Sequence, residues 1–371
     1  MGTIKQSLAN NVETGGKHDA KDLSGTIPAS NIANSSLSDV TAVNAALGDL
    51  RQTVSSDPSP ASFGDIWYNS TLQKVRLLQK DTGSWASGGN MNTARGNGLG
   101  GAGSSQSNAL AFGGDGGGNL NESYNGSSWS ESAELNTSRA YLVGTGATNT
   151  AALAVGGNGN AQVESWNGSS WTEVADISPA RGYANLAGTS TSALCSGGFN
   201  PSYGNGNDPA SQEWDGSSWT EVAEMNTPRY AAAGMGSNTE AVLIAGGSAA
   251  GGPGNAQAET WNGSSWTEVG DLNQPRYNLK GSGTQTLALV FGGAGPAAGN
   301  IIGNTEEWNG SSWTETTDLS TGRRGIASAT GGSTSDTLAF GGNVAPSASA
   351  SNTNATEEWS APTSAKSISG S

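Results

Sequence analysis

The chain has 371 residues, of which 57 are glycine, 12 are tryptophan and only 34% are hydrophobic, and its net charge is −15. This acidic charge repels phosphates and anionic lipid surfaces, so we expect no nucleic-acid partner. No apolar run reaches the ~18 residues of a membrane span, so we expect no membrane insertion. With one histidine, His18, and one cysteine, Cys195, the sequence excludes a His-rich metal site and an internal disulfide. We expect no cofactor and no metal.

Residues 1–60 contain no tryptophan and few apolar residues, which predicts an extended segment that needs a partner to become ordered. Within this segment, residues 39–54 predict a helix with Ser38 or Asp39 as its N-cap. Its apolar residues follow the 3-4 spacing of a coiled-coil seam, and they are Val40, Val43, Leu47, Leu50 and Val54. The spacing predicts an oligomerisation stalk, most simply a homotrimer, and leaves open a single amphipathic helix packed on the rest of the protein.

Residues 61–80 follow a stiff linker, Asp57-Pro58-Ser59-Pro60, and predict a small neck. Within Gly64–Leu78, two strand-like runs flank a polar turn, Asn69-Ser70-Thr71. This pattern predicts a β-hairpin.

Residues 81–360 repeat three marks in a fixed order. A tryptophan of the hairpin phrase aromatic-Asn-Gly-Ser-Ser-Trp is followed about ten residues later by an arginine, and a Gly-Gly pair then closes an apolar strand. The tryptophans are Trp85, Trp129, Trp171, Trp219, Trp266 and Trp313; the arginines are Arg95, Arg139, Arg181, Arg229, Arg276 and Arg323. Each mark occurs six times with four strand-like stretches per unit, and the Asn-Gly pair predicts a type I′ turn with two positive-φ residues. The pattern predicts an all-β, six-bladed β-propeller.

The two ends of this region complement each other. The last copy stops at Glu357-Glu358-Trp359 without its second tryptophan, and the first copy starts at Trp85 without the strand before it. We therefore expect the N- and C-terminal parts to share one blade, with two strands from each end, which closes the ring and removes free strand edges. Residues 361–371 are expected to form a C-terminal tail.

The order of these marks resembles the kelch repeat, with Met225-Asn226-Thr227-Pro228-Arg229 as the nearest copy. The resemblance implies four-stranded blades around a central channel and says nothing about chemistry. The N-terminal block resembles tail-fibre and other virion structural proteins of tailed phages, through Leu23-Ser24-Gly25-Thr26-Ile27-Pro28 and Gly64-Asp65-Ile66-Trp67-Tyr68. That resemblance implies a location in the virion, after assembly in the host cytoplasm, with other virion proteins as partners.

Most repeats contain three acids and one arginine. In one repeat, Glu164, Glu173 and Asp176 precede Arg181. Glycosidase chemistry needs two particular acids in different environments. One pattern repeated around a ring favours structural ion pairs between arginine and acids of neighbouring blades. We predict no catalytic residue and no enzymatic activity.

The loops after the Gly-Gly pairs are long and dissimilar, whereas the turns between the two aromatic positions are short and uniform. Variable loops on a rigid ring are where binding usually occurs, and we expect these loops to share a face with the arginine loops. The candidate binding residues are Phe199, Tyr203, Tyr141, Tyr183, Tyr230 and Tyr277. The tyrosines are expected either to stack on sugars at this face or to be buried in packing.

The predicted function is that of a phage virion structural protein, a tail fibre or other appendage, whose propeller head binds a glycan or receptor on the host surface. The alternatives are a non-enzymatic kelch module for protein interaction, and a capsid-surface decoration without receptor binding.

Overall fold

The protein is all-β in the computed structural model, which describes residues 53–59, 65–202, 206–248, 254–297, 300–345 and 351–367. Seven four-stranded sheets are present in these residues, one more than the six that the repeats predict. The chain divides into two compact units. Thr82–Ala361 contains six of the sheets, and the residues before and after it contain the seventh.

The six sheets of Thr82–Ala361 share one plan, in which the chain runs from an inner strand to an outer strand through antiparallel neighbours. From the inner to the outer strand they are β5 (Gly100–Ser105), β6 (Asn108–Phe112), β7 (Asn121–Tyr124) and β8 (Trp129–Ser132); β9 (Val143–Thr148), β10 (Ala151–Val155), β11 (Val163–Trp166) and β12 (Trp171–Val174); β13 (Asn185–Gly188), β14 (Ala193–Ser196), β15 (Ser211–Trp214) and β16 (Trp219–Val222); β17 (Ala233–Asn238), β18 (Ala241–Ala245), β19 (Ala258–Trp261) and β20 (Trp266–Val269); β21 (Lys280–Gly283), β22 (Ala288–Phe291), β23 (Thr305–Trp308) and β24 (Trp313–Glu315); and β25 (Ala327–Ser328), β26 (Asp336–Phe340), β27 (Thr356–Ser360) and β4 (Ser84–Ser87).

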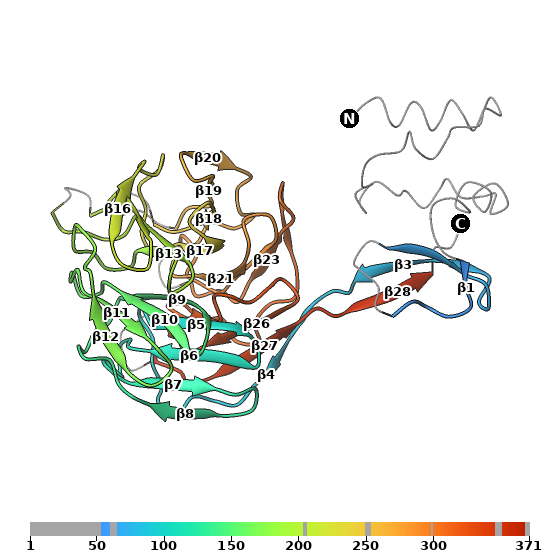
Figure 1. Ribbon diagram of the computed structural model, residues 1–371, viewed down its shortest axis with the longest axis horizontal. Helices are drawn as coiled ribbons and strands as arrows, with labels where there is room; N and C mark the ends of the chain where they lie inside the picture. The colour runs from blue at the N-terminus through green and yellow to red at the C-terminus, as the bar shows by residue number, and fades with distance from the viewer. Residues whose placement is uncertain are drawn as a thin grey trace. The chain divides into compact units, whose positions relative to one another are not determined.

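These six sheets form a closed, propeller-like ring. Each inner strand contacts the next in the order β5, β9, β13, β17, β21 and β25, and β25 contacts β5 again. The last sheet takes β4 from the N-terminal side of the ring and β27 from the C-terminal side, and the two strands pair with Trp85 opposite Trp359 (Figure 1). The predicted sharing of one sheet by the two ends is therefore confirmed, but the predicted division into two strands from each end is wrong: three strands come from the C-terminal side and β4 alone from the N-terminal side.

Glycine on the inner strands allows these strands to approach one another closely. A Cβ atom on Gly101 of β5 would lie 2.4 Å from the carbonyl oxygen of Ser328 on β25, and one on Gly144 of β9 would lie 2.4 Å from the ring of Phe112. The second strands are apolar and buried along their length, as in β22, because sheets pack on both of their faces. Low overall hydrophobicity is thus compatible with a core that is divided among the interfaces between sheets.

The second tryptophan of most repeats ties neighbouring sheets together. The indole N–H of Trp266 on β20 donates to the carbonyl oxygen of Ala223, and that of Trp313 on β24 donates to the carbonyl oxygen of Gly270. Each acceptor follows the outer strand of the preceding sheet. Because the rings are also buried, each sheet is joined to its predecessor by apolar contact and by a hydrogen bond.

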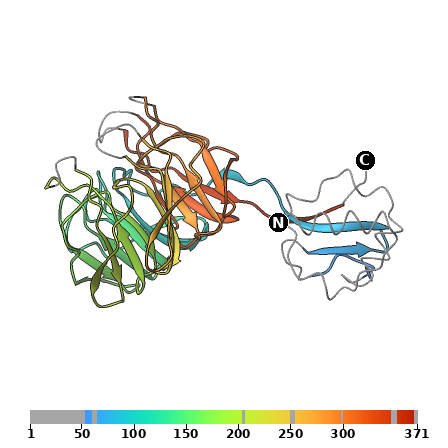
Figure 2. The same cartoon turned by 90° about the horizontal axis from the view of Figure 1, so that it is seen from above.

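The seventh sheet corrects two predictions. It consists of β1 (Thr53–Val54), β2 (Ile66–Asn69), β3 (Lys74–Lys80) and β28 (Thr363–Ser367), in that order. The predicted hairpin is confirmed as β2 and β3, and β28 pairs with β3 where the sequence predicted only a tail (Figure 2). Thr53 and Val54, predicted as the end of a helix, form a strand parallel to β2, whereas residues 39–52 of that helix lie outside the described residues.

The hairpin at Asn167-Gly168 is present, but its turn differs from the predicted type I′ turn. Trp166 pairs with Trp171, so the loop has four residues, and Gly168 has a positive φ of 94° while Asn167 does not. The Asn167 side chain explains the difference. Its Oδ1 accepts hydrogen bonds from the backbone N–H groups of Ser169 and Ser170 at 2.9 and 3.0 Å, which stabilises the longer loop.

Candidate binding face

The six repeat arginines lie on the connections that lead from the outer strand of one sheet to the inner strand of the next. Their guanidinium groups are buried, and five of the six are ion-paired to a glutamate on the third strand of the sheet that the chain then enters. The N–O distance is 2.8 Å for both Arg95–Glu122 and Arg139–Glu164. The other two acids of each repeat are exposed, as Glu173 and Asp176 are.

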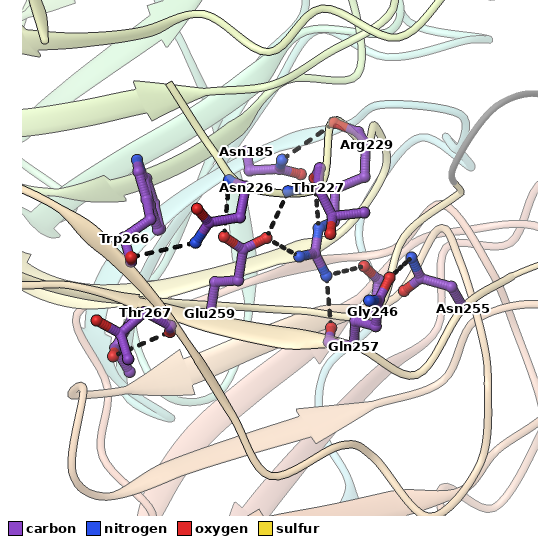
Figure 3. Close-up of polar contacts among 11 residues, drawn as sticks. Asn185, Asn226, Thr227, Arg229, Gly246, Asn255, Gln257, Glu259, Trp266 and Thr267 are labelled. Atoms are coloured by element: carbon purple, nitrogen blue, oxygen red, sulfur yellow. Dashed lines mark hydrogen bonds and ion pairs between the residues drawn. The ribbon is translucent and has the colours of Figure 1, made fainter. Parts of the chain in front are cut away.

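Arg229 and Glu259 show what such a pair holds in place (Figure 3). Arg229 donates to the carbonyl oxygen of Gln257 at 2.6 Å, and Glu259 accepts from the backbone N–H groups of Asn226 and Thr227 at 2.9 and 3.1 Å. Burial lowers the pKa of the Arg229 guanidinium, and the facing Glu259 carboxylate opposes this shift. The pair therefore fixes the connection between sheets onto the sheet that follows, and its acid is fully engaged.

Gln212 replaces the glutamate in the repeat of Arg181, and the structure supplies another carboxylate in its place. Asp208, from the long loop before β15, lies 3.5 Å from Arg181, and Gln212 accepts a hydrogen bond from Arg181 at 3.3 Å. Asp208 is fully buried. The requirement for a buried negative charge next to each arginine is thus met in all six repeats by two different routes.

A ring of left-handed residues surrounds the axis two positions after each arginine. Asn97, Tyr141, Tyr183, Ala231, Asn278 and Gly325 have φ between 44° and 60°. Each of the last five donates its backbone N–H to the carbonyl oxygen of the preceding member, at 2.8 to 3.0 Å. These five hydrogen bonds fix the backbone from which two of the candidate tyrosines project.

The long loops pair with the arginine connections, which confirms that the two share a face. Isolated bridges join Gly182 to Phe199, Tyr230 to Ser248 and Arg324 to Asn343. We call the surface formed by these connections and the long loops the long-loop face. Backbone pairing at the base of each loop makes this face a defined support for the variable segments above it.

Four aromatic rings gather on the long-loop face. Tyr141 stacks on Tyr183 with centroids 4.7 Å apart, Tyr183 lies 6.0 Å from Tyr230, and Phe199 meets Tyr230 edge-on at 5.6 Å. We call these four residues the aromatic patch. Burial, with smaller contributions from Tyr141 and Tyr230, raises the pKa of the Tyr183 hydroxyl. The three tyrosines are half-buried and Phe199 is 40% exposed, so the patch combines internal packing with an accessible apolar surface.

The remaining two candidates lie elsewhere. Tyr277 is half-buried, and its backbone forms a β-bridge with Ala294. Among the described residues, its ring is not paired with any ring of the aromatic patch. Tyr203 lies outside the described residues. The position of a tyrosine after its arginine did not predict whether it joins the patch. Tyr230, which joins it, and Tyr277, which does not, both follow their arginines by one residue.

Two residues that the sequence analysis did not single out are important to the geometry. Asp208 completes the sixth ion pair, and the absence of a glutamate at position 212 was the available signal. Lys280 lines a cavity on the axis and is the only lysine between residues 82 and 361, which the composition already showed.

Among the described residues, no group of three or more histidine, cysteine, aspartate or glutamate side chains has the arrangement to hold a metal ion. Within the same ranges, no helix has the length and apolarity to cross a membrane.

Comparisons with known proteins support the fold alone. No protein-family model matches the chain, and no curated protein matches it. A solved structure described as the structure of YjhT is similar with a TM-score of 0.58 and 13% sequence identity, over 72% of this chain and 96% of that one. At this identity the similarity shows that the chain shares the all-β, propeller-like architecture of that protein.

Proposed function

We propose that this chain is a structural protein of a phage virion, in a tail fibre or another appendage, and that its long-loop face binds a glycan on the host surface. The aromatic patch carries the binding part of the proposal. Half-buried aromatic rings with fixed orientation offer apolar area to a sugar at low entropic cost.

The ion pairs support a binding role for the ring over a catalytic one. Each repeat arginine and its acid are buried and bonded to one another and to the backbone, so the repeated acids serve the packing of the sheets. The virion part of the proposal rests on the resemblance of the N-terminal block to phage fibre proteins. One phrase of that block, Ile66-Trp67-Tyr68, forms most of β2, where the Trp67 indole donates to Asp57 at 2.9 Å.

A single contact of this kind is weak, on the order of −4 kcal/mol or a millimolar dissociation constant. Multiple copies on one particle raise the overall affinity without new contacts. We therefore also propose that residues 1–52 form a homotrimeric stalk through Val40, Val43, Leu47 and Leu50, which lie outside the described residues. Replacing Val43→Asp together with Leu47→Asp should lower the mass measured by light scattering from trimer to monomer. A wild-type monomer at micromolar concentration contradicts this part.

Loop replacement tests the binding face. Short Gly-Ser loops grafted over residues 199–211 and 294–304 should abolish the attachment of multivalent protein to host cells. Asp208 must be retained in the first graft, because it pairs with Arg181. The melting temperature of the ring serves as the control for folding. If attachment survives both grafts in folded protein, the long-loop face is not the binding surface; if multivalent wild-type protein ignores host cells, the ring is a surface decoration.

A further inference from the structure

Lys280 occupies an unusual position for a cation. It is the first residue of β21, an inner strand, and pairs with Phe291, the last residue of β22. The residues at the same register position in the other five sheets are uncharged, and they are Gly100, Val143, Asn185, Ala233 and Ala327. The repeat pattern therefore does not require a lysine at this position. The ammonium group of Lys280 is a single positive charge at a position that is uncharged in the other sheets.

The side chain of Lys280 lines a small cavity on that axis. The cavity has a volume of about 20 Å³ and is lined by residues from all six repeats. Its walls are mostly apolar, with Leu142, Val143, Leu279 and Ile326 among them. A single water molecule needs roughly 10–15 Å³, so the cavity has room for one small occupant.

No described residue neutralises the Lys280 ammonium group. The described contacts include neither an ion pair nor a hydrogen bond from its Nζ, whereas the repeat arginines all have acidic partners. The other titratable side chain lining the cavity is Tyr183, which is influenced by the positive charge of Arg324. Lys280 is half-buried, and desolvation of its amine lowers the pKa to about 8, so most of the amine is still protonated at pH 7.

A half-buried charge without a partner next to apolar walls is costly, and a counter-ion that fits the space removes much of that cost. We propose that the axial cavity is a binding site for a small monovalent anion of the size of chloride, held by the ammonium group of Lys280. The exposed acids of the ring lie on or after the outer strands, away from the axis, as Glu173 and Asp176 do. The bound anion stabilises the closed ring by neutralising the one unpaired charge at its centre.

The proposal predicts a definite pH dependence. Without an anion, the folded pKa of about 8 lies below the unfolded value of 10.5. The unfolded chain then binds more protons between these values, so stability should rise as the pH increases through this window. An anion binds only the protonated amine, so its stabilising effect should be full below pH 8 and should disappear towards pH 10.

The experiment measures the melting temperature of the full chain by tryptophan fluorescence, which reports on the ring because 11 of the 12 tryptophans lie there. Bromide is titrated at pH 7 and at pH 10, with ionic strength held constant by sulfate. Wild-type protein and the control Lys74→Met, which changes an exposed lysine of β3, should show a saturable rise at pH 7 and none at pH 10. Lys280→Met, an uncharged side chain of similar length, should show no rise at either pH.

The anomalous signal of bromide in crystals of the wild-type protein gives a second readout that does not depend on the variant. A peak next to Lys280 Nζ supports the proposal. A melting temperature of the wild type that does not respond to bromide, an equal response in Lys280→Met, or bromide bound only elsewhere overturns it. If Lys280→Met fails to fold, the pH dependence of the wild type and the bromide peak decide the question.

Discussion

At the scale of single residues, the sequence predicted structural ion pairs between arginines and acids in the repeats, but it did not predict which acids take part. One arginine and three acids recur in most repeats, which correctly indicated buried ion pairs. In five of the six sheets the acid on the third strand pairs with an arginine, because the strand alternation turns it towards the connection that leads into the sheet. The sequence alone could not distinguish this acid from the exposed ones, since all three are spaced regularly.

Removing one partner of such a pair should be far more damaging than removing an exposed acid. Glu164→Ala leaves Arg139 buried without a carboxylate and also removes the acceptor of the Asn136 N–H. We expect a loss of roughly 3–5 kcal/mol in the free energy of unfolding. Glu173→Ala, the exposed residue directly opposite on β12, should change it by less than about 0.5 kcal/mol. Equal losses in chemical denaturation would contradict the structural role of the pair.

At the scale of elements, strong local signals were reliable and weak ones were not. The hairpins between aromatic positions and the sharing of one sheet by both ends followed from repeated phrases and from the incomplete end copies. The strand β28 was missed because Thr363-Ser364-Ala365-Lys366-Ser367 has no apolar alternation, and its pairing with β3 depends on residues far away in the sequence. Thr53 and Val54 were assigned to a helix because heptad spacing does not record the parallel partner β2.

The four-residue hairpin loop depends on a positive φ at one glycine. Gly168 has room for a side chain, since the nearest atom to an added Cβ lies 3.4 Å away, but its φ of 94° disfavours one. Gly168→Val should therefore cost roughly 1–3 kcal/mol in unfolding free energy. The control is Gly182→Ala, where the spacing is similar and φ is not positive. A valine variant as stable as the wild type would show that the loop readily adopts another backbone conformation.

Two truncations separate the roles of the C-terminal strands. Deleting residues 362–371 removes β28 and should leave the melting temperature of the ring unchanged, because β27 still pairs with β4. Deleting residues 356–371 also removes β27 with the fully buried Trp359, and the cooperative melting transition should be lost at the wild-type temperature. The loss of Trp359 alone is worth roughly 3–5 kcal/mol. Identical melting curves for the two truncations would contradict closure through β27.

At the scale of the whole molecule, the closed ring of Thr82–Ala361 converts a chain of low hydrophobicity into a rigid support with one variable face. The sequence predicted which loops vary and on which face they lie. It did not predict that Tyr141, Tyr183, Tyr230 and Phe199 would meet, because these residues come from different repeats and their contacts depend on the curvature of the ring. It also gave no indication of a cavity on the axis beyond the presence of a single lysine.

The central claim is that the aromatic patch recognises neutral sugars, and one matched pair of variants tests it most directly. Phe199 is 40% exposed on the long-loop face, and Leu287 is 52% exposed on the turn between β21 and β22, at the opposite end of the strands. Full-length wild-type protein, Phe199→Ser and Leu287→Ser are passed over a panel of immobilised neutral polysaccharides from bacterial surfaces. We predict that wild type and Leu287→Ser bind the same polysaccharide and that Phe199→Ser loses at least about tenfold in affinity, equivalent to about 1.4 kcal/mol. Equal binding by all three proteins, or no binding to any member of the panel, would contradict the account.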